Sequence, residues 1–258
     1  LQELEEYFEK LEIGSSIKLR QFLADAEKKY QIGKKDLVYK PSLKLTEFAD
    51  TRILSGLFKM HLFTSFASFI RKYFSHPKII SLLEFPILFL GATPQDTPAL
   101  YSLMNYADIQ LGTWYPLGGM FEFVKAFEKI ALEQGVRFSL NTRVTGFNTS
   151  NGKIQSISTS QGEIACDYVI SGADYQHTEQ LLKNQANYTD SYWEKRIMAP
   201  SCLLFYVGLD CKVPGLQHHN LFFDEDFEQH AKEIYKNPKW PGKPLFYASC
   251  PSKTDPSV

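Results

Sequence analysis

The stretch Trp114-Tyr115-Pro116-Leu117-Gly118-Gly119-Met120, with the residues that follow it to Val144, decides the fold class of this 258-residue chain. Two adjacent glycines predict a tight turn, because glycine readily takes the left-handed backbone angles that such turns require. An amphipathic run to Gln134 predicts a helix, and the alternating apolar residues after Gly135 predict two short strands. Turn, helix and strands in succession indicate a mixed fold.

The composition is that of a packed globular protein. Hydrophobic residues make up 44% of the chain and charged residues 22%, which disfavours disorder as the main state. The 28 Lys and Arg residues nearly balance the 29 Asp and Glu residues, so the formal net charge is -1. No long-range field attracts DNA or RNA, and we expect no nucleic-acid partner.

Cysteine usage indicates neither a zinc site nor a redox pair, because no Cys-x-x-Cys or His/Cys spacing occurs. The four cysteines are Cys166, Cys202, Cys211 and Cys250. Buried reduced thiols are one interpretation, although an even count and the Asn-x-Ser/Thr triplets at Asn148 and Asn187 would also suit a secreted protein. The chain shows no signal peptide, so we favour the cytosol. Because it begins at Leu1 and ends abruptly, we expect it to be a piece of a larger enzyme.

The first part of the chain predicts helices. Apolar residues recur at helical spacing to about residue 30, with a break near Gly14. The run from Ile53 to Phe74 is much more apolar, but charged residues interrupt it too often for a membrane span. With its spaced cations it could lie on a membrane surface or pack inside the protein. We take residues 1–110 as a helical subdomain and a candidate membrane-docking region.

The second part, residues 111–258, predicts a mixed region. Alternating apolar residues indicate a small antiparallel sheet, with a turn at Ser150-Asn151-Gly152-Lys153. Further strands are expected at 167–170, 203–209, 221–223 and 245–248, and a helix at 227–235. A helical subdomain joined to a mixed or antiparallel sheet places the chain in the α+β class.

Three short motifs each allow a functional and a purely structural interpretation. Gly118-Gly119 before a helix could offer free amides to an anion or a carbonyl, or could be a plain turn. Ser171-Gly172-Ala173-Asp174 could let a ring system approach the backbone, or could simply end a strand with Asp174 as a helix cap. Adjacent strand residues such as His218 and His219 should point to opposite faces, so we expect no shared metal ion there.

The aromatic content, 20 Phe and 14 Tyr, would suit either a pocket for a long apolar ligand or an ordinary core. No Ser-His-Asp order, phosphate-binding loop or paired-carboxylate pattern stands out. Hydrolase and phosphotransferase functions are therefore unsupported, and we expect no metal site.

In combination and order, these motifs resemble the phytoene desaturase (phytoene dehydrogenase) family of bacterial type, within the FAD-dependent amine oxidase superfamily. The resemblance is good from residue 89 to the end and loose before it. It rests on the runs Phe89–Pro94, Pro98–Met104, Gly112–Met120, Asn141–Val144, Ser171–Asp174, His218–Phe223 and Cys250–Ser257.

The resemblance implies FAD as cofactor and assigns this chain to the substrate-binding part of a two-domain oxidoreductase. The dinucleotide-binding Gly-x-Gly-x-x-Gly turn does not occur in the 258 residues, and the resemblance places it, with a C-terminal FAD segment, outside the chain. Two groups of residues carry implied roles. The cofactor group beside FAD is Arg143, Val144, Ser171, Gly172, Ala173 and Asp174. The wall where flavin and polyene meet is Tyr115, Pro116, Gly118, Gly119 and Met120.

The implied reaction removes two hydrogens from adjacent carbons of an apolar isoprenoid, so it requires no protein nucleophile. Glu47, Asp50 and Arg52 fall near the place where such enzymes carry an acidic and a basic residue, but catalytic residues stay unassigned. A water-insoluble substrate implies peripheral contact with a membrane. We expect the chain alone to be inactive and to bind FAD weakly.

Alternatives within the superfamily are a carotenoid isomerase, a ketolase-like oxygenase or a retinol saturase. A non-catalytic lipid-binding module is the alternative from another class.

Overall fold

The computed structural model describes residues 1–34, 38–39, 41, 43–44, 61–197, 199 and 201–258. The chain divides into two compact units. Unit 1 comprises Leu1–Glu122 with Pro200–Val258, and unit 2 comprises Phe123–Ala199. Each unit is described by itself.

Unit 1 begins with a helical hairpin made of α1 (Gln2–Leu11) and α2 (Ser15–Ile32). Gly14 joins the two helices with φ of 80°, a left-handed conformation that costs glycine little. The Glu9 carboxylate accepts hydrogen bonds from the backbone N–H groups of Gly14 and Ser16, at 2.6 and 3.0 Å. These bonds satisfy amides at the start of α2 that have no partner within the helix.

The core of unit 1 lies between α2 and the short helices that follow it, α4 (Phe66–Ile70) and α5 (Pro77–Glu84). Phe22 of α2 is fully buried, with ring centroids 5.9 Å from Phe69, 5.6 Å from Tyr73 and 6.1 Å from Phe74. Edge-on aromatic packing of this kind adds to the free energy of apolar burial. The helical segments that follow α5 in the chain are the 3-10 turns Phe85–Leu90 and Ala99–Ser102, α6 (Leu103–Tyr106) and the π-helical turn Ala107–Leu111.

A buried lysine fastens α2 to this core. The Lys29 ammonium lies 2.6 Å from Asp25 Oδ2, donates to Ser102 Oγ at 3.0 Å and sits 3.8 Å from the centroid of the Phe69 ring. Burial lowers the pKa of Lys29, and the Asp25 carboxylate opposes that change. The Lys29 ammonium therefore connects α2 with α4 and with the 3-10 turn Ala99–Ser102.

The apolar run Ile53 to Phe74, our candidate membrane-docking segment, has a different role over its second half. Phe66, Phe69 and Phe74 are buried in the core against α2, which favours the alternative that this half packs inside the protein. Residues 53–60 lie outside the described residues. Phe63, by contrast, is 96% exposed.

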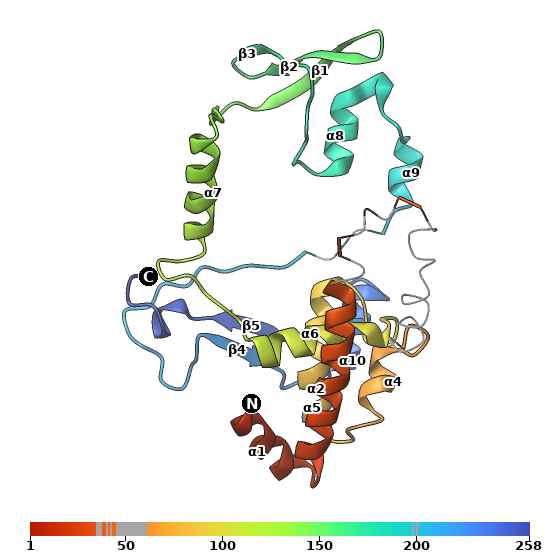
Figure 1. Cartoon of the computed structure of the whole chain (residues 1–258), viewed down its shortest axis with the longest axis vertical. Coiled ribbons are helices and arrows are strands. Elements are labelled where there is room, and N and C mark those ends of the chain that lie inside the picture. Colours follow the sequence, from red (N-terminus) through yellow and green to blue (C-terminus); the bar gives the residue numbers. More distant parts are fainter. Residues whose placement is uncertain (35–37, 40, 42, 45–60, 198, 200) are drawn as a thin grey trace. The chain divides into compact units, whose positions relative to one another are not determined.

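The C-terminal part of unit 1 adds a two-stranded antiparallel ribbon of β4 (His219–Phe222) and β5 (Phe246–Ser249). Between the two strands, α10 (Phe227–Tyr235) packs on the helical part. The Tyr235 hydroxyl donates to the Leu88 carbonyl at 2.7 Å, and the Lys236 ammonium lies 2.5 Å from Asp96. These elements confirm the predicted helix at 227–235 and both late strands (Figure 1).

Unit 2 contains a three-stranded antiparallel sheet in the order β1 (Val144–Ser150), β2 (Lys153–Thr159), β3 (Gly162–Ala165). Asn151 and Gly152 form the first turn, with φ of 52° and 71°, the pattern favoured in two-residue hairpins. Helix α8 (Tyr175–Leu182) packs beside β1, and α9 (Asp190–Glu194) follows (Figure 1). Helix α7 (Phe121–Glu133) leads into this unit. The predicted small antiparallel sheet is confirmed for these three strands, and so is its turn at Asn151-Gly152.

Three predicted strands do not form, namely those at 136–140, 167–170 and 203–209. Their side chains are largely exposed, reaching 98% for Ile170 and 92% for Tyr206. A strand is stabilised only when a neighbour takes up its backbone hydrogen bonds, and the described part of the chain offers these segments no neighbour. The described residues thus form a set of helices with two small antiparallel sheets.

Candidate functional site

The predicted substrate wall forms one continuous turn in unit 1. Gly118 and Gly119 have φ of 91° and 97°, values that any side chain with a Cβ would strain. The Gly119 N–H donates to the Pro116 carbonyl at 3.1 Å, and the Glu122 N–H donates to the Gly119 carbonyl at 3.0 Å. The two glycines are therefore required by the backbone path that leads into α7.

The free amide expected at this turn is already occupied by an anion from the same chain. The Gly118 N–H donates to Asp255 Oδ2 at 2.7 Å. A Cβ placed on Gly118 would also lie only 3.1 Å from the Glu122 side chain. Because the Asp255 carboxylate occupies the Gly118 N–H, this amide is not free to bind an anionic ligand.

The histidine pair lies against the same turn. The ring centroids of Tyr115 and His218 are 4.6 Å apart in an edge-on arrangement, and those of His218 and His219 are 4.3 Å apart. The prediction that the two histidines point to opposite faces is therefore wrong, because β4 begins only at His219 and His218 precedes the regular pleat. Within the described ranges, no group of His, Cys, Asp and Glu side chains is arranged to hold a metal ion.

Each histidine has one hydroxyl partner. His218 Nδ1 lies 2.5 Å from Thr254 Oγ1, and His219 Nδ1 lies 2.5 Å from the Tyr247 hydroxyl. Burial and the neighbouring His218 lower the pKa of His219, with a smaller opposing effect from Asp108. At neutral pH His219 is therefore an uncharged ring in a short row of aromatic side chains.

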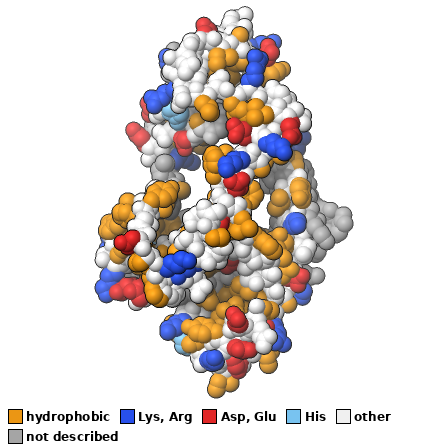
Figure 2. All heavy atoms as spheres, turned by 90° about the vertical axis from the view of Figure 1, so that its left-hand side faces the viewer, with side chains coloured by type: hydrophobic (Ala, Val, Ile, Leu, Met, Phe, Trp, Pro, Cys, Tyr) orange, Lys and Arg blue, Asp and Glu red, His pale blue; other side chains and the backbone are white. Residues whose placement is uncertain are grey.

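Apolar side chains surround the turn at the surface. Trp114, just before it, is 86% exposed, and Leu117, Met120 and Phe121 are exposed as well. Helix α7 continues this pattern with no buried residue. Figure 2 shows hydrophobic side chains exposed at several places on one face of the molecule, with charged side chains between them. Exposed apolar area of this extent is typical of surfaces that another group covers.

The cofactor group lies in unit 2, in two segments. Arg143 donates its backbone N–H to Ser160 Oγ at 3.1 Å and accepts the Ser160 N–H at 2.8 Å, while Val144 opens β1 opposite Thr159. These residues sit at the first rung of the sheet. Their backbone groups are held in an extended conformation.

The second segment leads into α8. Ser171 Oγ lies 2.7 Å from Thr178 Oγ1 and accepts the Ala173 N–H at 3.3 Å. Asp174 caps α8 by accepting the His177 N–H at 3.1 Å, so the capping interpretation of this residue is confirmed. Nothing lies within 4 Å of a Cβ placed on Gly172, which leaves open space beside the backbone.

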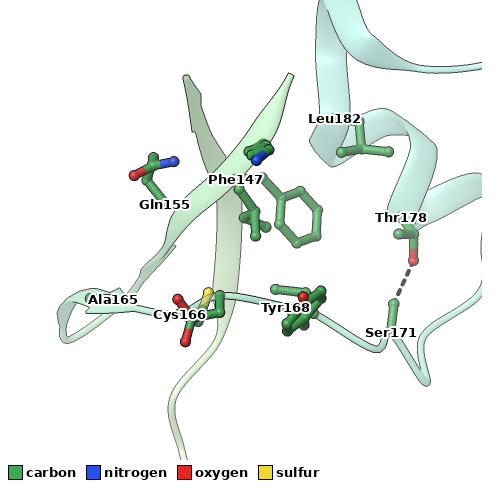
Figure 3. Close-up of a pocket in the computed structure, with 12 residues that line it drawn as sticks. Phe147, Gln155, Ala165, Cys166, Tyr168, Ser171, Thr178 and Leu182 are labelled. Atoms are coloured by element: carbon green, nitrogen blue, oxygen red, sulfur yellow. Dashed lines mark hydrogen bonds between the residues drawn. The ribbon is translucent and has the colours of Figure 1, made fainter. Parts of the chain in front are cut away.

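A hollow of about 830 Å³ lies between the sheet, the segment after β3 and α8. Ser171 is the member of the cofactor group among its lining residues, whereas the other members lie outside that lining. Figure 3 shows Phe147 reaching from β1 toward Tyr168, with Leu182 and Thr178 of α8 on one side of the two rings and Gln155 and Cys166 on the other. The volume falls in the usual range for small-molecule sites, roughly 300–1,000 Å³.

The hollow combines aromatic rings with a few polar groups, among them Gln155, Lys153 and the Ser171 hydroxyl. Rings can stack on a planar base, and amide and hydroxyl groups can bind its edge. With the open backbone at Gly172, these residues fit part of a dinucleotide cofactor. The phosphates would require a glycine-rich turn at a helix N-terminus, and the sequence has no Gly-x-Gly-x-x-Gly.

Sequence reasoning gave no role to Thr254 or Asp255, which the structure brings to the turn. Both residues belong to the run Cys250–Ser257, which is one of the runs that carry the family resemblance. The contact joins Gly118 and Asp255 across 137 residues, and no local pattern could have revealed it. Glu47, Asp50 and Arg52 lie outside the described residues, so their placement stays a prediction.

Comparisons with known proteins match the sequence of this chain to one family. The model for the flavin containing amine oxidoreductases matches residues 11–258. A carotenoid 3,4-desaturase of Haloarcula japonica is 31% identical, with 99% of this chain and 52% of that protein covered. A zeta-carotene-forming phytoene desaturase of Myxococcus xanthus is 27% identical, with 97% and 48% covered, and a 4,4'-diapolycopene oxygenase of a Methylomonas species is 30% identical, with 79% and 41% covered. The chain spans about half the length of the curated relatives it matches.

Proposed function

The chain belongs to the flavin containing amine oxidoreductase family, and on that premise we propose that it is part of an FAD-dependent carotenoid desaturase. The observation that carries the proposal is the match to proteins named for carotenoid desaturation along nearly the whole chain. The proposed substrate is an apolar isoprenoid polyene. Two adjacent carbons would each lose one hydrogen, and a new carbon–carbon double bond would form between them.

The geometry of the glycine turn supports an uncharged substrate. Asp255 occupies the Gly118 amide, so a phosphate or carboxylate would find no free donor there and would meet the charge of Asp255. Exposed apolar residues such as Trp114 and Met120 can instead cover a hydrocarbon chain and exclude water from it. In the proposed enzyme, Tyr115, Pro116, Gly118, Gly119 and Met120 line the polyene.

FAD, when bound, would accept the hydride. In this proposal the chain holds part of it through the backbone at Arg143 and Val144 and through the segment Ser171-Gly172-Ala173-Asp174. The hydroxyl of Ser171 and the rings of Phe147 and Tyr168 line a hollow of suitable size. No side chain of the described residues is assigned as the acceptor of the proton.

We propose further that the remaining half of the protein completes both the fold and the cofactor site. The unpaired extended segments at 136–140, 167–170 and 203–209 support this, because their exposed apolar residues lack the strand neighbours they require. The chain alone would then bind FAD weakly. A water-insoluble polyene also requires peripheral contact with a membrane, from the cytoplasmic side. The described part of the chain contains no helix of the length and hydropathy needed to cross a bilayer.

A second candidate within the family is an oxygenase, and the match to the 4,4'-diapolycopene oxygenase favours it. A carotenoid isomerase or a retinol saturase would use the same landmarks. A non-catalytic lipid-binding module remains the alternative from another class. Substrate and product distinguish all of them.

The test uses the full-length protein with FAD and phytoene-loaded liposomes, followed by the visible spectrum of the extracted lipid. New long-wavelength polyene bands establish desaturation, and their positions count the added double bonds. Bound flavin without new bands contradicts the proposal and favours the related activities. A parallel titration with this chain alone should give no stoichiometric yellow complex, and such a complex would overturn the proposed division of the FAD site.

A further inference from the structure

The segment that follows β5 contacts three distant parts of unit 1 with three consecutive residues. Lys253 Nζ donates to the Val213 carbonyl at 2.6 Å, Thr254 Oγ1 meets His218 Nδ1 at 2.5 Å, and Asp255 Oδ2 accepts the Gly118 N–H at 2.7 Å. Lys253 ends the 3-10 turn Pro251–Lys253, and Thr254 and Asp255 follow it directly. We call Thr254 and Asp255 the clasp.

Asp255 carries an unusual arrangement for a carboxylate. The residue is only 1% exposed, and its second oxygen, Oδ1, accepts both the backbone N–H and the hydroxyl of Ser257, at 2.9 and 2.6 Å. No lysine or arginine of the described residues forms an ion pair with it. These hydrogen bonds, from Ser257 first and then from Gly118, lower the pKa of Asp255. Hydrogen bonds from Ser257 and from the glycine turn thus hold the charge, and the electrostatic effect of His218 adds to them.

Thr254 reaches the same turn by another route. Its hydroxyl fixes one nitrogen of His218, and the His218 ring packs edge-on against Tyr115 at 4.6 Å between centroids. The Cys250 N–H donates to the His218 carbonyl at 2.7 Å and holds the backbone at that point. Both ends of the stretch 115–118 are therefore attached to the clasp.

A turn with two glycines has little preference for one conformation, because glycine has more backbone freedom than any other residue. An external contact must therefore choose its geometry. A fully hydrogen-bonded buried carboxylate makes such a contact specific, since a displaced amide leaves the charge unsatisfied. The turn is also closely surrounded at Gly119, where an added Cβ would lie 3.7 Å from the Tyr115 hydroxyl and 3.8 Å from the Val258 side chain.

Resting on the proposed function, we propose that Asp255 and Thr254 are positioning residues that hold the Tyr115–Gly119 turn in the geometry that lines the polyene. Neither residue is expected to contact the reacting atoms. Their effect on the reaction passes through Gly118 and through His218 with Tyr115.

The test compares variants of the full-length enzyme by amide hydrogen exchange and by steady-state kinetics. Asp255→Asn should raise the exchange rate of the Gly118 amide about tenfold or more, because a charged acceptor is lost. The KM for the polyene should rise several-fold while kcat changes less, since the wall contacts substrate before and during reaction. FAD content should be unchanged. Ser252→Ala, on the same segment but outside the clasp, is the matched control.

Thr254 supplies the second pair of variants, which remain informative if Asp255→Asn fails to fold. Thr254→Val keeps the shape of the side chain and removes its hydroxyl, so the KM for the polyene should rise. Thr254→Ser keeps the hydroxyl, so its KM should equal that of the wild type. Equal behaviour of the Val and Ser variants, or unchanged Gly118 exchange in Asp255→Asn, overturns the clasp. Exchange needs no substrate, so faster exchange in an enzyme that never forms new polyene bands would support the clasp and refute the proposed function alone.

Discussion

Glu12 links three segments of unit 1 through one carboxylate, and its pH dependence can be calculated. Oε1 accepts a hydrogen bond from Lys18 Nζ at 2.8 Å, and Oε2 accepts the backbone N–H groups of Ser75 and His76 at 2.8 and 2.9 Å. Burial raises the pKa of Glu12, but these hydrogen bonds together outweigh it and lower the pKa from 4.5 to about 2. The ionised form is therefore the one that stabilises the fold.

The pKa change converts to roughly 3 kcal/mol of stability at pH 7, at about 1.4 kcal/mol per unit. The side chain is 13% exposed, so solvent screening removes only part of this. The unfolded carboxylate binds a proton more readily than the folded one, and stability is fully present above pH 4.5 and is lost as the pH falls toward 2. By about pH 3, close to 2 kcal/mol of the contribution should be gone.

Glu12→Gln tests this in the full-length protein by urea unfolding followed by circular dichroism. The variant should be about 2–3 kcal/mol less stable than wild type at pH 7, and the difference should shrink to about 1 kcal/mol near pH 3. Glu3→Gln, on the exposed side of α1, should stay within about 0.5 kcal/mol of wild type at pH 7. A Glu12→Gln difference that is equal at both pH values would refute the electrostatic explanation, even if its size at pH 7 were correct.

Three further predictions follow from packing and backbone geometry. Phe22→Ala should lower the unfolding free energy by about 3–5 kcal/mol in urea titrations. Phe63→Ala, at an exposed position, should change it by less than about 0.5 kcal/mol. Similar values for the two variants would place the core elsewhere. Gly118→Ala should lower the unfolding free energy by about 1–2 kcal/mol because of the left-handed φ of Gly118. Gly208→Ala, with nothing within 4 Å of the new Cβ, should leave the unfolding free energy nearly unchanged. An unchanged unfolding free energy in Gly118→Ala would contradict the turn geometry. The Glu179 carboxylate accepts hydrogen bonds from the backbone N–H groups of Asn187 and Tyr188, at 2.6 and 3.1 Å. Glu179→Gln should therefore speed the hydrogen exchange of these two amides, and unchanged exchange would show that the carboxylate does not hold the loop at Asn187 and Tyr188.

Local sequence patterns predicted much of the fold. The hairpin at Asn151-Gly152 and helix α10 form where turn chemistry and helical periodicity place them. The segment 203–209 has an equally clear apolar pattern, but it forms no strand. The alternation of apolar residues indicates which side chains a strand would bury. Whether the strand forms depends on a neighbouring strand, which local sequence cannot reveal.

The candidate site was predictable in part and for a similar reason. The glycines of the turn are visible because their backbone angles restrict the residue type. The carboxylate that fills the turn is not visible, since Gly118 and Asp255 meet only through the fold. The histidine pair was assigned to opposite faces by strand alternation, and that rule failed because the strand begins one residue later than His218.

The most direct test of the proposed activity is anaerobic mixing of the FAD-loaded full-length protein with its polyene, while the flavin and polyene absorbance bands are recorded together. The account predicts that the band of oxidised flavin bleaches as longer-wavelength polyene bands appear, with one flavin reduced for each double bond formed. A polyene whose bands change while the flavin stays oxidised would contradict it and indicate isomerisation. A flavin that stays oxidised beside an unchanged polyene would show that this substrate class is wrong.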